Sequence, residues 1–127
     1  MEGVQNTPVD IGVVMLANNR YRDEVYNFAA AGTLKAGTIL ARATNGKLVA
    51  YVKAAEDETG VPLAVVGYDL IASATGDMPF RPIVAGEVRK ERLIIAADGN
   101  ANNVDSKVID LLRSYGILPL NVNELGA

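Results

Sequence analysis

The sequence predicts a mainly β protein with one C-terminal α-helix: a small β-barrel or β-sandwich-like body behind an extended N-terminal arm. Short apolar, β-branched runs separated by glycine, asparagine and proline fill residues 32–96, as expected for strands joined by turns. Helical periodicity occurs near the C-terminus, and an apolar run at 9–16 is set apart by polar residues. With 127 residues, 50% hydrophobic and 21% charged, the chain suits one globular unit.

Residues 1–31 are expected to form the arm, and their apolar run admits two interpretations. It is either an ordinary strand of the body or a strand that pairs with another chain. An apolar run near a terminus is a natural donor for β-augmentation, and left uncovered it would promote aggregation. Under the second interpretation the candidate binding residues are Val9, Ile11, Val13, Val14, Met15 and Leu16.

Residues 32–127 are expected to form the body, which opens with a hairpin. The runs 38–43 and 47–53 read as its two strands. Between them lies Asn45-Gly46, a pair that readily takes positive φ at both central positions of a type I′ turn.

Three further runs complete the predicted sheet. Residues 62–71 read as a central, buried strand, in which Gly67 indicates a bulge or a close backbone approach. Residues 78–84 should begin as an edge strand, because two prolines remove ladder donors. The mixed charges at 87–92 predict a solvated turn, and the apolar run 93–96 returns to the core.

A helix is predicted at about 103–115, with Asn102 or Asn103 as N-cap and Gly116 as the left-handed residue after its end. The tail from residue 119 is either loose or docked on a neighbour. The helical spacing predicts one buried face, made of Val104, Val108, Leu111, Leu112 and Tyr115.

The composition argues against several classes of function. The chain has no cysteine and no histidine, which removes thiol nucleophiles, the Ser-His-Asp relay and the commonest metal ligands. A net charge of −3 does not suit a nucleic-acid binder. No apolar stretch is long enough to span a membrane, and the N-terminus does not resemble a signal peptide. The acidic run 56–58 lacks the spacing of a calcium loop, so we expect no metal site and no cofactor.

Several short motifs, taken in order, resemble the head decoration proteins of tailed bacteriophages, the family of phage lambda's head decoration protein. Members often read G-x-L-K-A-G-T-V-L before a turn and G-K-L-V after it. The apolar strand ending in a glycine, the G-E-V segment and the C-terminal helix also have counterparts here. The resemblance covers roughly 30–117 and is carried by residues 31–42, 45–51, 61–67, 85–88 with Leu93, and 104–117.

The resemblance implies a non-enzymatic structural protein of the virion. Such proteins bind the outside of the expanded capsid and cement neighbouring major capsid protein subunits against the pressure of packaged DNA. It also implies a homo-oligomer, a trimer rather than a dimer, made in the host bacterial cytoplasm. In the lambda-like case the N-terminal arm adds a strand to the capsid protein; carried onto this chain, that strand would be residues 9–16.

Three other functions remain open at this stage. A phage tail or baseplate barrel module would share the composition but assemble with tail proteins. A small-ligand-binding barrel without a viral role is another alternative, although two phenylalanines and no tryptophan offer little for carbohydrate stacking. An enzyme is the weakest candidate: carboxylate pairs such as Asp69 with Asp77 serve glycoside hydrolysis only within a cleft.

Overall fold

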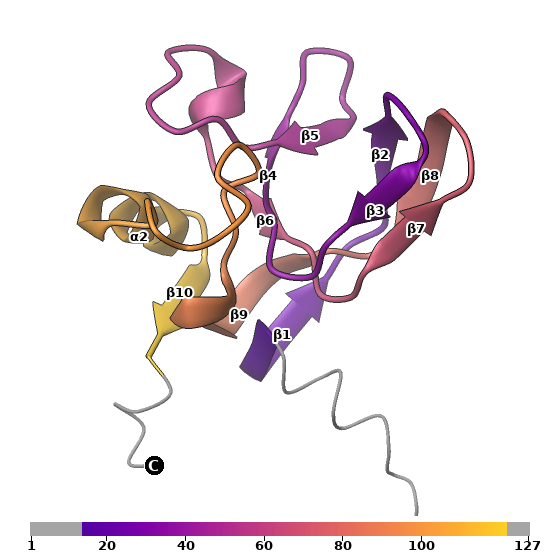
Figure 1. Ribbon diagram of the computed structural model, residues 1–127. Coiled ribbons are helices and arrows are strands. Elements are labelled where there is room, and N and C mark those ends of the chain that lie inside the picture. Colours follow the sequence, from indigo (N-terminus) through magenta and orange to yellow (C-terminus); the bar gives the residue numbers. More distant parts are fainter. Residues whose placement is uncertain (1–13, 122–127) are drawn as a thin grey trace, which may run out of the picture.

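The computed structural model describes residues 14–121, which form a mainly β body with one C-terminal helix, as the sequence predicts (Figure 1). An eight-stranded sheet curls into a half-barrel. The elements are β1 (Met15–Tyr21), β2 (Glu24–Phe28), β3 (Gly32–Leu34), β4 (Ile39–Arg42), β5 (Leu48–Ala50), the 3-10 turn η1 (Glu58–Gly60), β6 (Ala64–Val65), β7 (Leu70–Ala72), β8 (Gly76–Phe80), β9 (Ile83–Arg89), the 3-10 turn η2 (Lys90–Arg92), α2 (Ser106–Ser114) and β10 (Ile117–Leu120).

The strands of the large sheet follow the order β1-β9-β6-β4-β5-β2-β8, with β10 also beside β9. The β10–β9 and β2–β5 pairings are parallel, and the other pairings in this sheet are antiparallel. β8 ends the order at one edge, as expected for a run that contains Pro79. The predicted run 78–84 is nevertheless two strands, because the chain turns at Arg81-Pro82 and continues as the central strand β9.

A long antiparallel ribbon forms one side of the half-barrel. Phe28 pairs with Gly76 in the β2–β8 ladder, and Gly32 pairs with Ala72 in the β3–β7 ladder, so the register is unchanged across the gap. Residues 29–31 and 73–75 lie opposite each other where the two ladders are interrupted, and all six are small and exposed. The ribbon is therefore one continuous pairing with an interruption in the middle, and the predicted strand 62–71 is divided between β6 and β7.

Two apolar clusters hold the body together. The larger joins the inner side of β1, β9 and β10 to helix α2, and the smaller fills the space between the ribbon and the β4–β5 hairpin. The larger contains Val14, Met15, Ile39, Tyr51, Val65, Ile83, Val88, Leu93, Ile95, Val104, Val108, Leu112 and Ile117. The smaller contains Phe28, Leu34, Leu40, Leu48, Ala64, Val66 and Ala72.

Helix α2 is shorter than predicted, and its N-cap differs. Asp105 caps it, because its carboxylate accepts hydrogen bonds from the backbone amides of Lys107 and Val108. Val104, Val108 and Leu112 are buried as expected, but Leu111 and Tyr115 are 40% and 44% exposed. The predicted apolar face was too wide, because the helix rests on β10 along a narrow stripe.

Gly116 ends the helix as predicted, whereas the turn at Asn45-Gly46 is of another type than predicted. Gly116 takes φ +95 after the helix, and its amide donates to the Arg113 carbonyl. The β4–β5 hairpin turns at Asn45-Gly46, but only Gly46 has positive φ, at +89. The Gly46 amide donates to the Ala43 carbonyl, and the Ala43 amide to the Lys47 carbonyl. The type I′ prediction is therefore wrong, and the contacts fit a type I turn followed by a left-handed glycine.

Gly67 follows β6, and the structure gives it no special backbone role. A Cβ there would lie 3.4 Å from the Met15 methyl group, an ordinary contact. Close backbone approaches occur instead at Gly37 and Gly86, where a Cβ would lie 1.9 Å from the Arg92 carbonyl oxygen and 2.5 Å from that of Asn18. The bulge expected at Gly67 is absent, and an irregular pairing lies between β1 and β9.

Candidate functional site

Both ends of the described chain leave the body at the same pole. Met15, the first residue of β1, pairs with Val88 of β9 from one side. Pro119 of β10 pairs with the same Val88 from the other side. The start of β1 and the end of β10 accordingly lie at one end of the molecule in Figure 1. We call this end, defined by Met15, Val88 and Pro119, the terminal pole.

The structure describes only part of the predicted binding segment. Val9, Ile11 and Val13 lie outside the described residues. Val14 and Met15 are 0% and 3% exposed, and they pack in the larger apolar cluster. Leu16 is half-buried in β1. The side chains of Val14 and Met15 therefore stabilise this chain's own core, and the described part of the arm expected over 1–31 is paired within the sheet.

A close backbone contact fixes β1 to β9 beyond the terminal pole. Asn18 has φ +56, and its carbonyl passes directly over Gly86, which itself has φ +113. The Asn19 side-chain amide donates to the Glu87 carbonyl at 2.9 Å. The Gly86 amide donates to Gly116 on the β10 side, so β9 is held from both directions. These contacts hold the middle of β1 against β9.

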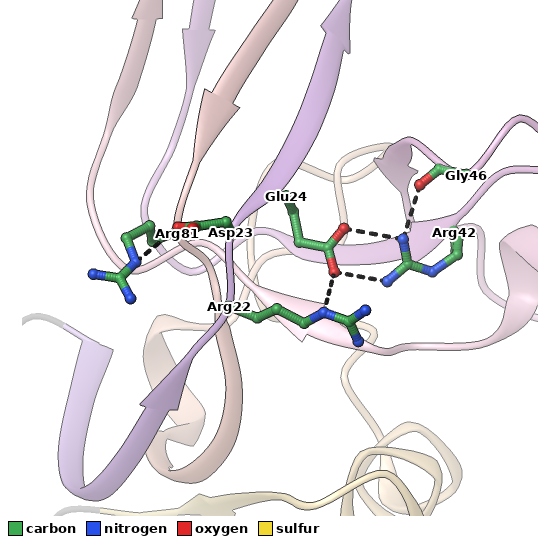
Figure 2. A network of polar contacts seen from close by, with 6 residues as sticks. All are labelled: Arg22, Asp23, Glu24, Arg42, Gly46 and Arg81. Carbon is green, nitrogen blue, oxygen red and sulfur yellow. Dashed lines mark hydrogen bonds and ion pairs between the residues drawn. The ribbon is translucent and has the colours of Figure 1, made fainter.

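A polar network joins β2 to the β4–β5 hairpin (Figure 2). Arg42 donates to both carboxylate oxygens of Glu24, at 3.0 and 2.8 Å, and also to the Gly46 carbonyl at 2.8 Å. Arg22 approaches the same carboxylate at 3.5 Å. The Glu24 side chain is only 8% exposed, and the Arg42 hydrogen bond lowers the pKa of Glu24 against the opposing effect of burial. A carboxylate held in this way is a structural clamp.

The other carboxylates considered at the sequence level also make structural contacts. Asp69 accepts a hydrogen bond from the Ala36 amide at 2.8 Å. Asp77 accepts from Asn27 and pairs with Lys47, each at 2.7 Å. Asp57 caps η1 through the Thr59 amide. Within residues 14–121, no group of three or more histidine, cysteine, aspartate or glutamate side chains is placed to hold a metal ion.

A comparison with models of protein families shows to which family the chain belongs. The model of the bacteriophage lambda head decoration protein D matches residues 5–117 of the 127-residue chain. The chain belongs to the phage head decoration protein family. The match begins well before residue 30, where the sequence motifs alone started to carry the resemblance, and it runs through helix α2. A comparison with curated proteins finds no match.

Membership of the decoration family indicates the general role of the protein. The family consists of structural proteins of the phage head, which agrees with a role on the capsid. In the part of the chain that the structure describes, no helix is long and apolar enough to cross a membrane. Because a decoration protein acts through its surface, we take the terminal pole as the candidate functional site and argue for it below.

The body also contains contacts that no pattern in the sequence predicted. The Glu24–Arg42 clamp joins residues 18 positions apart, and no local pattern marks either residue. The contact between Asn18 and Gly86 is equally non-local. Only the G-E-V motif at 86–88 indicated that this stretch was special, and it did so through the family resemblance.

Proposed function

We propose that this protein binds the outer surface of the expanded phage capsid and cements neighbouring major capsid protein subunits, which stabilises the head against packaged DNA. It acts as a homo-oligomer, with a trimer as the expected form. The grip is the apolar N-terminal segment, with Val9, Ile11 and Val13 as the side chains that meet the capsid protein.

The observation that supports this proposal best is the terminal pole. Because β1 and β10 flank β9 at the same residue, the N-terminal segment leaves the body beside the C-terminal end. In our proposal this pole faces the shell. The opposite end of the half-barrel, with the β4–β5 hairpin, then faces outward.

Cementing by such segments depends on several acting together. One extended segment contributes a few main-chain hydrogen bonds and limited apolar burial, which gives modest affinity. When several segments are joined in one oligomer, each later one binds at high effective concentration, so overall attachment strengthens by about 10²–10⁴. Strong attachment therefore favours an oligomer in which every subunit presents its N-terminal segment at its terminal pole.

The decisive experiment is co-sedimentation with expanded, undecorated capsids of the parent phage. A variant that begins at Val14 is the right truncation, because a cut at Gly32 would remove β1 and β2 from the sheet. We expect saturable binding by the full chain and loss of binding by this variant. Ile11→Asp should also abolish binding, while Gln5→Asp, with the same change of charge in the polar stretch, should bind normally.

Each alternative result has a definite meaning. Binding by both the full chain and the truncation would keep the capsid role and move the contact to the body. Binding by neither would contradict the proposal and favour a tail or baseplate role. Native mass spectrometry of the unbound protein tests the oligomer separately, and a monomer at working concentration would contradict the avidity argument.

A further inference from the structure

The turn of the β4–β5 hairpin contains Asn45-Gly46, the one Asn-Gly pair in the sequence. Both residues are exposed, and the hairpin lies at the end of the half-barrel away from the described chain ends (Figure 1). Asparagine is a thermally labile residue, and a following glycine has no side chain to shield its backbone nitrogen. The pair is therefore a place where the chain can react with itself.

The reaction open to this pair is attack by the Gly46 backbone nitrogen on the side-chain Cγ of Asn45. The new N–Cγ bond closes a succinimide ring, and the Cγ–Nδ2 bond breaks. The Nδ2 amine leaves as ammonia, with the proton that the Gly46 nitrogen gives up. Water then opens the ring at Cγ to give aspartate, or at the main-chain carbonyl to give isoaspartate. Solvent water is the co-reactant, and no group is oxidised or reduced.

In the folded turn, hydrogen bonds hold both reacting groups. The Gly46 amide donates to the Ala43 carbonyl at 2.9 Å, so the proton that the reaction removes is engaged. Asn45 Oδ1 accepts from the Lys47 amide at 2.9 Å, which fixes the side-chain carbonyl. Attack requires the nitrogen to lose its proton and to approach Cγ to about 3–3.5 Å. The hydrogen bond between Gly46 and Ala43 must therefore open before the pair reacts.

The polar clamp on β2 also holds this turn (Figure 2). Arg42 donates to the Gly46 carbonyl at 2.8 Å and, with the same guanidinium group, to both carboxylate oxygens of Glu24. The Glu24 side chain is only 8% exposed, so one end of this connection is fixed in the body. The Ala43 amide donates to the Lys47 carbonyl at 2.8 Å across the base of the turn. Opening the turn therefore separates Gly46 from Arg42.

We propose that Asn45 is a site of self-modification, and that the Glu24–Arg42 clamp sets its rate by holding the turn closed. Reaction occurs in the open turn, so the observed rate is the intrinsic rate multiplied by the open fraction. The aspartate product leaves the main chain unchanged. The isoaspartate product lengthens the main chain between positions 45 and 46, which moves the Gly46 carbonyl away from Arg42. Molecules that carry isoaspartate accordingly lose part of the clamp.

Peptide mapping by mass spectrometry during incubation at mildly alkaline pH measures the reaction. Each event adds about 1 Da to the peptide that contains residue 45, and isoaspartyl methyltransferase labels the isoaspartate product. We expect slow modification of Asn45 in the folded protein, and modification about tenfold faster or more in protein unfolded by urea. Asn27, which is followed by Phe28, is the internal reference and should stay unmodified over the same period.

Glu24→Gln tests the part played by the clamp. It removes the charge that holds Arg42, and we expect Asn45 in the folded variant to be modified about fivefold faster than in wild type. The matched control is Asn19→Ala, which removes a hydrogen bond to the Glu87 carbonyl between β1 and β9, and it should keep the wild-type rate. Arg42→Lys should also accelerate the reaction, because lysine cannot reproduce the paired hydrogen bonds. Urea midpoints check that all three variants are folded during the incubation.

Three results would overturn the proposal. An unmodified Asn45 in the urea-unfolded protein would show that the pair does not react. Equal rates in folded and unfolded protein would show that the turn gives no protection. Equal rates in Glu24→Gln and Asn19→Ala would show that the clamp does not control the opening.

The stability of the products provides a second readout. Asn45→Asp, which is the aspartate product, should keep the wild-type urea midpoint, whereas the purified isoaspartate form should have a lower midpoint. An isoaspartate form as stable as wild type would contradict the predicted loss of the contact between Arg42 and Gly46. All these measurements use the free protein, so their outcome does not depend on whether the protein binds shells.

Discussion

Replacing Gly86 with alanine tests whether β1 belongs to the body. Gly86 has φ +113, and an added Cβ would lie 2.5 Å from the Asn18 carbonyl oxygen and 2.7 Å from the Asn19 Cα. The positive φ costs about 1–2 kcal/mol for a residue with a Cβ. The collision with rigid backbone adds about 1–3 kcal/mol. We therefore expect Gly86→Ala to lower the free energy of unfolding by about 3 kcal/mol.

Two other glycines separate these contributions. Gly46 has φ +89 with open space around it, so Gly46→Ala carries the backbone strain alone and should cost about 1 kcal/mol. Gly32 has neither positive φ nor any atom within 4 Å of the added Cβ. Gly32→Ala should be neutral or stabilise by a few tenths of a kcal/mol, because alanine restricts the unfolded chain.

The assay is urea unfolding followed by far-ultraviolet circular dichroism, with protomer concentration held constant because the protein is proposed to associate. The three variants should share one m-value and differ in midpoint, in the order Gly86→Ala, Gly46→Ala, Gly32→Ala from least to most stable. If Gly86→Ala is no less stable than Gly46→Ala, then β1 does not lie over Gly86 in solution. The arm would then extend past residue 14, as the sequence alone suggested.

The remaining predictions concern the clamp and the helix. Glu24→Gln should cost about 1–2 kcal/mol at pH 7. Because Arg42 lowers the pKa of Glu24, the stabilisation is present above the ordinary pKa of 4.5 and is lost as the pH falls through the folded-state pKa. The free energies of unfolding of wild type and Glu24→Gln, measured by urea unfolding at a series of pH values, should therefore converge at low pH. A constant difference between them at every pH would refute the clamp. Leu112→Ala should lower the free energy of unfolding by about 2–5 kcal/mol, because the Leu112 side chain is 0% exposed. Leu111→Ala should lower it by less than about 1 kcal/mol, because Leu111 is 40% exposed. Equal losses in urea unfolding would contradict the observed helix face. Asp105→Ala should cost about 1 kcal/mol in thermal unfolding, whereas Asp105→Asn should keep most of the capping; equal losses would show that the ion pair with Lys53 matters more than the cap.

The candidate site was only partly predictable. The apolar alternation at Val9, Ile11 and Val13 is visible in the sequence, and so is its position near a terminus. Met15 continues the alternation and Val14 extends the apolar run, but both side chains pack in the core. A strand's side-chain pattern says that one face is covered and does not say by which chain, because the ladder hydrogen bonds are the same in either case.

The sequence by itself determined the features that depend on neighbouring residues. The β4–β5 hairpin at Asn45-Gly46, the end of α2 at Gly116 and the edge strand at Pro79 all follow from backbone preferences within a few positions. The mainly β class with one C-terminal helix follows from hydrophobic periodicity, which is also local.

Only the tertiary structure decided the features that depend on distant partners. It paired β1 with β9 and aligned β2–β3 with β7–β8 in one register. It also brought Glu24 to Arg42 and placed both chain ends beside Val88. Short strands pair through main-chain groups that every residue carries, so the choice of partner is made by the packing of the whole core.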